Sequence, residues 1–215
     1  ILCDTATPWN GTAAIWPWGI IGLEIRYNKI ENATTFGVGL SDNNRNVLIL
    51  ENEVSLGDPG GDAVPSVATA GIRVGPAQND DVHIEGNIIY NCPGTAAKPG
   101  AGIRIQTYPY IEFGTGITRG SFTYAIDNIV TDCPIGVRTT ADAAGSQIEI
   151  EGNTFEDNEV QVSDGAEALI IEDVLTGNTF DRAVTVNHPG DSLLHTIWSK
   201  IQDGIDATVA GDTIN

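Results

Sequence analysis

The segment Val82-His83-Ile84-Glu85-Gly86-Asn87-Ile88-Ile89 decides the fold of this chain, because its pattern returns along the sequence. Apolar residues alternate before an Asn, and another apolar residue stands two positions after it. Further copies centre on Asn28, Asn52, Asn128, Asn153 and Asn178. Successive asparagines lie 24, 35, 41, 25 and 25 residues apart, so the base period is about 24 to 25 residues and two repeats carry insertions.

Each copy predicts two short strands joined by a bend at the Asn, because its apolar residues alternate with period two. A third strand follows, and it is often opened by Gly: Gly37-Val38-Gly39-Leu40, Gly71-Ile72-Arg73-Val74, Gly102-Ile103-Arg104-Ile105 and Gly136-Val137-Arg138. Asn tolerates the left-handed backbone of a bend, and its amide can bond the equivalent Asn one turn away. Three strands and three bends per period indicate stacked turns of a parallel solenoid. A β-sandwich would need hairpin turns at shorter spacing.

These repeats resemble the pectate-lyase-like superfamily of parallel β-helix proteins over roughly residues 20–188. The resemblance implies an all-β fold, a right-handed single-stranded parallel β-helix of about six to seven coils with a short C-terminal amphipathic helix. That superfamily includes lyases, hydrolases, epimerases, phage tailspikes and many surface proteins. The resemblance therefore indicates the fold without choosing one activity.

The predicted organisation has three parts: an N-terminal cap at 1–20, the β-helix at 21–190 and a different segment at 191–215. A solenoid must cover its apolar end, so the aromatic residues of the first part, Trp9, Trp16 and Trp18, are expected to form a cap. The alternative is a platform on which sugars stack.

The last part changes period, because Leu193, Ile197, Ile201 and Ile205 fall four residues apart. This spacing predicts an amphipathic helix that Asp191 or Ser192 is placed to cap. An extended segment is expected near residues 211–214. Helix and strand together look like the opening of a second β-helix, and the alternative is that the helix caps the first one.

The composition gives 10 basic and 29 acidic residues and a formal charge of −19, which argues against a nucleic-acid partner. No apolar run is long enough to cross a membrane. The sequence starts with Ile1 and has no Met, which suggests a processed chain or part of a larger protein. The sequons that begin at Asn10 and Asn32 agree with an extracellular or cell-surface location.

The best candidate site is a stripe of arginines, because Arg73, Arg104 and Arg138 occupy one register in the Gly-opened strands. Their partners are either surface carboxylates or an acidic glycan, whose carboxylates and sulfates Arg binds in a bidentate manner. Two insertions, 56–70 and 94–101, precede the first two of these strands. A loop with Tyr108 and Tyr110 follows, and these tyrosines are candidates for binding the same glycan. Ordinary tolerance of insertions in solenoid loops is the alternative explanation.

Asp80, Asp81 and His83 form the one compact acid–histidine group in the sequence. The two aspartates are candidates for holding Ca²⁺, and otherwise no cofactor is expected. A glycosidase needs paired carboxylates, whereas the expected outward positions of the first strand run Glu24, Leu48, His83, Tyr124 or Ala125, and Glu149. Two cysteines in equal register, Cys92 and Cys133, predict either a disulfide or stacked buried thiols.

Two functions follow from these observations. The first is a non-catalytic module of an adhesin-like or envelope protein that contacts acidic glycans and self-assembles through its solenoid ends. The alternative is a polysaccharide lyase acting on uronates, with Arg104 or His83 removing the proton α to the carboxylate.

Overall fold

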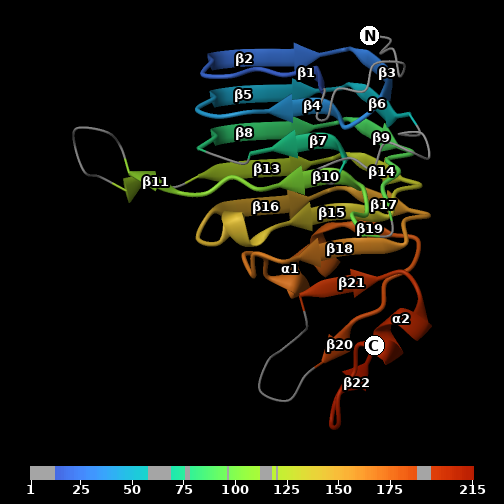
Figure 1. The fold of residues 1–215 in the computed structure, drawn as a ribbon. Helices are drawn as coiled ribbons and strands as arrows, with labels where there is room; N and C mark the ends of the chain where they lie inside the picture. The colour runs from blue at the N-terminus through green and yellow to red at the C-terminus, as the bar shows by residue number, and fades with distance from the viewer. Residues whose placement is uncertain are drawn as a thin grey trace.

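The computed structural model describes residues 13–57, 69–75, 78–95, 97–111, 118–119, 121–187 and 195–215. The chain winds through coils that stack from the N-terminal end to the C-terminal end, as the colours in Figure 1 show. Each coil contributes one strand to each of three parallel sheets. The predicted parallel β-helix is therefore confirmed.

The three sheets are named here sheets 1, 2 and 3. Sheet 1 contains β1 (Ala13–Ile15), β4 (Phe36–Leu40), β7 (Ala70–Val74), β10 (Ala101–Ile105), β15 (Ile135–Thr139), β18 (Val160–Asp164) and β21 (Thr196–Trp198). Sheet 2 contains β2 (Ile21–Arg26), β5 (Arg45–Leu50), β8 (Asp80–Glu85), β13 (Phe122–Ile126) and β16 (Gln147–Glu151). Sheet 3 contains β3 (Lys29–Ala33), β6 (Glu53–Leu56), β9 (Ile88–Tyr90), β14 (Ile129–Thr131), β17 (Thr154–Glu156) and β19 (Thr179–Phe180).

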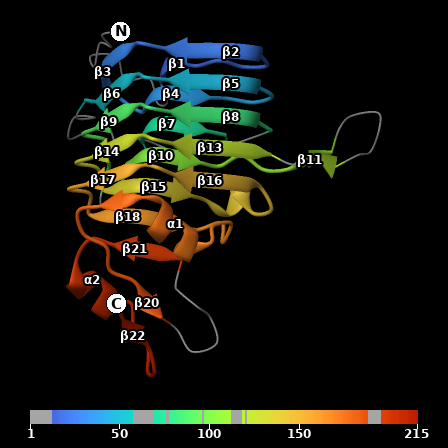
Figure 2. The same cartoon turned by 180° about the vertical axis from the view of Figure 1, so that it is seen from behind.

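Five coils within the described residues have a strand in all three sheets. Strand β1 precedes them as part of an incomplete turn. After the fifth coil, helix α1 (Ile171–Gly177) takes the place of a sheet 2 strand, and β19 follows it in sheet 3. Figure 2 shows α1 at the lower end of the stack. The expected six to seven coils are reached only when these incomplete turns are counted.

The core lies inside the coils, where alternate residues of all three sheets meet. In the third coil Ile84, Ile89 and Ile103 come from sheets 2, 3 and 1 and have no exposed surface. Period-two alternation produces this arrangement, because every second side chain of a strand points to the same face. The same inward positions recur in neighbouring coils, so the core runs the length of the stack.

A ladder of asparagines joins the coils at the corner between sheets 2 and 3. Asn52 shows the pattern: its backbone N–H and its side-chain amide both donate to Oδ1 of Asn87, at 2.9 and 3.0 Å. The same pair of bonds links Asn28 to Asn52, Asn87 to Asn128, Asn128 to Asn153, and Asn153 to Asn178. The predicted bonding between equivalent asparagines is confirmed.

The left-handed backbone at this corner belongs to the residue before each Asn, which corrects the expectation from the sequence. The residues with positive φ there are Tyr27, Glu51, Gly86, Asp127 and Gly152. The Asn itself must direct both its N–H and its amide along the stack, so the preceding residue makes the bend. Gly precedes the Asn in three of the repeats, and the bend explains two of them, because Gly86 and Gly152 have positive φ.

The Gly-opened strands of sheet 1 are explained by crowding rather than by a bend. A Cβ placed on Gly102 would lie 2.3 Å from Cγ1 of Val130 and 2.9 Å from the carbonyl oxygen of Gly136. Gly71 is equally confined, by the side chain of Ile89 and the carbonyl oxygen of Gly102. Only a residue without a side chain fits where sheets 3 and 1 meet in these coils.

The C-terminal segment differs from the predicted helix. Residues Thr196–Trp198 form β21, which pairs antiparallel with β18, and the helix α2 covers only Ile201–Asp206. The reason is that β18 would otherwise present an open strand edge, which an extended segment can pair with and a helix cannot. Ile201 and Ile205 of α2 are 66% and 43% exposed. Asp191, Ser192 and Leu193 lie outside the described residues.

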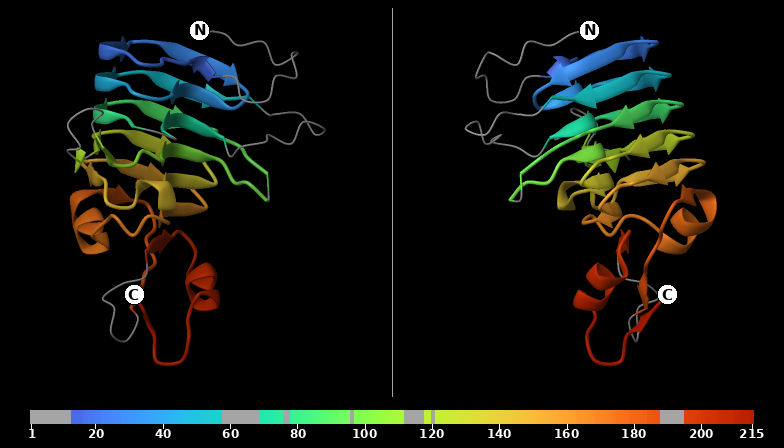
Figure 3. Two further views of the ribbon diagram at one scale, coloured as in Figure 1. Left: turned by 60° about the vertical axis from the view of Figure 1, so that its left-hand side comes forward. Right: turned by 90° about the vertical axis from the view of Figure 1, so that its right-hand side faces the viewer.

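The last strand, β22 (Thr213–Ile214), pairs antiparallel with β20 (Val186–Asn187). Figure 3 shows this C-terminal segment, in red, below the stack of coils. The extended segment expected near residues 211–214 is thus present, but it pairs with an earlier strand of this chain.

At the other end, Trp16 lies edge-on to Phe36 with ring centroids 6.0 Å apart, whereas Trp18 is 70% exposed. Trp9 lies outside the described residues. Of the N-terminal tryptophans expected to form the cap, Trp16 therefore contacts the coils through the ring of Phe36, a sheet 1 residue.

Candidate functional site

The three arginines of the predicted stripe lie side by side on sheet 1. Arg73 pairs in register with Arg104, and Arg104 pairs with Arg138, on strands β7, β10 and β15. Ser163 continues the row on β18. The arginines alternate with core residues such as Ile72 and Val74, so their side chains leave the core on the outer face of the sheet. The register predicted from the repeats is confirmed.

Arg73 is not available as a surface ligand, in contrast to the expected outward stripe. The residue is only 8% exposed, and its Nε donates to Oε1 of Gln106 at 2.7 Å. Its guanidinium lies over the ring of Phe36, 4.7 Å from the centroid. Burial lowers the pKa of Arg73, and the nearby charge of Asp42 partly offsets this. These contacts indicate that Arg73 holds the outer surface of sheet 1 together.

Arg104 and Arg138 are more accessible, because both residues are half-buried rather than buried. Among the residues that the structure describes, Arg138 forms no ion pair with a carboxylate. Two guanidiniums at the spacing of neighbouring strands repel each other unless an anion lies between or above them. The pair is therefore suited to an anionic group such as a carboxylate or a sulfate.

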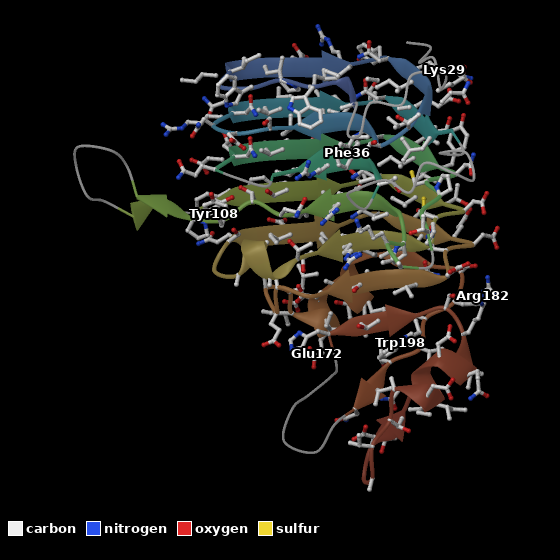
Figure 4. The ribbon with its side chains drawn as sticks, viewed as in Figure 1. Lys29, Phe36, Tyr108, Glu172, Arg182 and Trp198 are labelled. Atoms are coloured by element: carbon white, nitrogen blue, oxygen red, sulfur yellow. The ribbon has the colours of Figure 1, made fainter. Side chains whose placement is uncertain are left out.

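The insertions join the strands of sheet 1 at both of their ends. Residues 57–69 connect β6 to β7 and residues 91–100 connect β9 to β10, so both insertions lead from sheet 3 into sheet 1. The third insertion follows the C-terminal end of β10 and contains the antiparallel pair β11 (Tyr110–Ile111) and β12 (Thr118–Arg119), with β11 labelled at the left of Figure 1. Tyr108 lies at the base of this hairpin and is 37% exposed (Figure 4). The side chain of Tyr110 is outside what the structure describes.

His83 lies on sheet 2, so it does not share a face with the arginines. Its ring nitrogens lie 3.1 Å from carboxylate oxygens of Asp81 and Glu85, and its ring stacks on that of Tyr124 with centroids 4.5 Å apart. In the row of outward positions the structure aligns Tyr124 with His83, and it buries Ala125 in the core. A cleft that contains both His83 and the arginine stripe is not formed.

The aspartates proposed for calcium separate within β8. Asp81 contacts His83 on the outer face, while Oδ1 of Asp80 is buried without a hydrogen-bond partner. Among the described residues, no group of three or more His, Cys, Asp and Glu side chains has the arrangement of a metal site. The use of Ca²⁺ stays a prediction.

Cys92 and Cys133 are neighbouring free thiols, and both are buried. The contact with Cys133 and the burial raise the pKa of Cys92 well above its usual value. Cys3 lies outside the described residues. The structure thus has the stacked thiols, one of the two arrangements that the sequence leaves open.

One buried polar cluster has no counterpart in the sequence reasoning. The side chain of Asp164 is fully buried and accepts hydrogen bonds from the hydroxyl of Thr139 and the backbone N–H of Leu169. Nδ1 of His195 lies 3.6 Å from its Oδ2. Because His195 follows a segment of different period, no repeat register could have placed it beside β18.

These features define a class of protein: a solenoid with three parallel sheets, an internal Asn ladder and a cationic row on one outer face. A family model described as right handed beta helix region matches residues 13–196. The chain therefore belongs to the right-handed β-helix family. Neither the comparison with curated proteins nor that with solved structures finds a match. No helix in the described part of the chain is long and apolar enough to span a membrane.

Proposed function

We propose that this chain is a non-catalytic β-helix module of an extracellular or cell-surface protein, of the adhesin or envelope kind, that contacts acidic glycans through Arg104 and Arg138. The observation that carries the proposal concerns Arg138, which is half-buried, lies in register beside Arg104 and itself forms no ion pair with a carboxylate of the described residues. A glycan with repeated carboxylates or sulfates offers such a row one anionic group for each guanidinium.

The charges on the outer side of sheet 2 support this choice of face. The outer side of sheet 2 carries Glu24, Asp81, Glu85 and Glu149, and an acidic glycan would be repelled there. Sheet 1 presents guanidiniums instead, and Tyr108, which follows β10, offers an aromatic surface for a sugar ring. Exposure of Asn32, the first residue of a sequon, supports an extracellular location.

Binding to a panel of acidic and neutral polysaccharides, with and without Ca²⁺, tests the proposal. We expect saturable binding to an acidic member of the panel, weakened by salt and reduced at least tenfold in the double variant Arg104→Ala/Arg138→Ala. Arg26→Ala is the matched control, because Arg26 is exposed on sheet 2 and pairs with Glu24. Equal binding by the double variant and the control would refute the assignment of this face. Arg73→Ala is unsuitable as a test, since the loss of its buried contacts would disturb the fold.

The alternative function is a polysaccharide lyase, and the same panel distinguishes it. Its version with His83 as the base needs His83 beside the uronate-binding arginines, and the two lie on different sheets. A version with Arg104 as the base predicts unsaturated products that absorb in the ultraviolet and vanish in Arg104→Ala. Turnover of any polysaccharide would replace the non-catalytic proposal.

Self-assembly through the solenoid ends is a further part of the proposal. Among the described residues β2 is the outermost strand of sheet 2 at the N-terminal end, and Ile20 and Ile21 are 39% and 70% exposed. An open edge with exposed apolar side chains favours pairing with another chain. Sedimentation at several protein concentrations measures this, and Ile21→Lys should keep the chain monomeric if the N-terminal end takes part.

A further inference from the structure

A cleft of about 580 Å³ runs along β16, between this strand and helix α1. One wall is the strand itself with its flanking residues, 146–151. The other wall comes from the segment 168–177, which contains α1. Figure 2 shows the helix at the lower end of the stack, and the cleft separates it from β16, the last strand of sheet 2 among the described residues.

The edge of β16 that faces this cleft is open. Among the described residues the strand is last in sheet 2 and pairs only with β13. On that side the N–H of Gln147 donates to the carbonyl of Ser121, and the carbonyl of Glu151 accepts from the N–H of Asp127. In a parallel ladder the intervening residues direct their backbone groups to the opposite side. Ile148 and Ile150 therefore face α1 with their N–H and C=O groups.

Helix α1 covers this edge without satisfying it. The N–H of Gly152 donates to the carbonyl of Gly177, and the carbonyl of Ile150 accepts from the amide of Asn178, so pairing resumes only at the far end. Between its ends a helix bonds its own backbone groups internally, so among the residues of α1 only its last residue, Gly177, pairs with the β16 side of the cleft. The N–H and C=O of Ile148 and the N–H of Ile150 are thus left directed into the cleft.

The side chains around the cleft define what it would accept. Ile148, Leu169 and Val174 give it an apolar floor, and Ile170 is 64% exposed at its margin. Glu149, Glu151 and Asp173 are exposed carboxylates along it, and no Lys or Arg is among the residues of its walls. A partner must therefore bring backbone groups, apolar side chains and positive charge together.

We propose that this cleft binds an extended basic peptide segment of another protein, which adds to sheet 2 as a sixth strand beside β16. An extended peptide supplies backbone donors and acceptors for Ile148 and Ile150. Its alternate side chains point to opposite faces, so apolar residues reach the floor while Lys or Arg residues meet Glu149 and Asp173. This binding site is separate from the arginine stripe, which lies on sheet 1.

Titration of the intact chain with the blocked peptide acetyl-Lys-Val-Lys-Val-Lys-Val-amide tests the proposal, with backbone amide spectra as the readout. We expect saturable binding, with shifts centred on Ile148, Ile150 and α1 and slower hydrogen exchange at the amides of β16. The corresponding Glu-Val peptide should bind at least tenfold more weakly. An absence of saturable binding, or equal binding of the two peptides, would overturn the proposal.

Two matched pairs of variants separate strand addition from general attraction. Ile148→Pro removes the N–H at an edge position where Pro is tolerated, and Ile148→Val keeps it. Asp173→Lys reverses a charge in the cleft, whereas Glu172→Lys changes its exposed neighbour on the same helix outside the cleft (Figure 4). We expect the first member of each pair to bind the Lys-Val peptide at least tenfold more weakly than the second.

Thermal unfolding of each variant shows whether the fold is intact, and the Asp173 pair keeps the test valid if Ile148→Pro does not fold. Equal affinities within the Asp173 pair would overturn the proposal. Concentration-dependent association of the chain with itself that the Lys-Val peptide displaces would also overturn it, because the occupant would then be a second copy.

Discussion

Asn87 and Asn128 are 41 residues apart in the sequence, yet two hydrogen bonds join them: the backbone N–H and the side-chain amide of Asn87 both donate to Oδ1 of Asn128. Asn128 in turn donates its side-chain amide to the carbonyl of Ile84 and to Oδ1 of Asn153. One side chain thus satisfies buried polar groups in two neighbouring coils. An insertion between these two residues leaves the register of the stack unchanged.

Replacing Asn128 by Ala should destabilise the protein by about 3 kcal/mol or more, because several buried donors and acceptors lose their partners at once. Asn28→Ala is the control at the exposed end of the ladder and should cost less than about 1 kcal/mol. Urea unfolding monitored by circular dichroism measures both. Equal losses would mean that burial of the ladder does not determine its contribution.

Replacing Gly102 by Ala should also destabilise the fold, by roughly 1–3 kcal/mol, since the added Cβ collides with Val130 and with the backbone of Gly136. Gly177→Ala provides the comparison, because its Cβ would have only ordinary contacts, at 3.6 Å or more. Thermal unfolding of the two variants should differ clearly. A Gly102→Ala protein as stable as the unchanged one would show that Val130 and the backbone of Gly136 can shift to make room for the added Cβ.

Acid should weaken the fold through Asp181. Burial opposes the charge of Asp181, but hydrogen bonds from the N–H of Asp157, the amide of Gln161 and Arg182 outweigh it and hold its pKa below 3.8. Folding lowers the pKa of Asp181, so its ionised carboxylate stabilises the folded protein at pH values above the pKa of the unfolded chain. This stabilisation is lost as the pH falls through the pKa of the folded protein. The midpoint temperature of thermal unfolding should therefore decrease as the pH is lowered from about 5 to about 3. The decrease should be smaller in Asp181→Asn. Identical profiles for the two proteins would contradict this role.

The thiols of Cys92 and Cys133 should resist alkylation in the native protein, because both are buried and the pKa of Cys92 is raised by its neighbour and by burial. Iodoacetamide labelling at pH 8, followed by mass spectrometry, measures this in a Cys3→Ser background. Both thiols should label once the chain is unfolded in denaturant. Failure to label in denaturant without a reductant would reveal a disulfide instead.

The periodic part of the fold was predictable from particular residues. Because one Asn per repeat marks the same corner, the spacing from Asn28 to Asn178 establishes the coils. It also aligns Arg73 with Arg104 and Arg138, and Cys92 with Cys133. The prediction of one helix from Leu193 to Ile205 was wrong for Thr196–Trp198, which form a strand, and the helix covers Ile201–Asp206. A spacing of four residues is also compatible with a short strand followed by a helix. The open edge of β18 selects the strand at Thr196–Trp198.

The sequence by itself determined the solenoid, its three strands per coil and the register between coils, because these depend on local periodicity and on one polar residue that bonds its own copy. Only the tertiary structure decided which aligned residues are accessible. It buries Arg73 against Phe36 and Gln106 and leaves Arg138 half-exposed, although both have the same register. It also places His83 on another sheet and leaves the edge of β16 open beside α1. The physical reason is that register sets position along the stack, whereas exposure depends on neighbouring strands, loops and helices that lie outside the repeat.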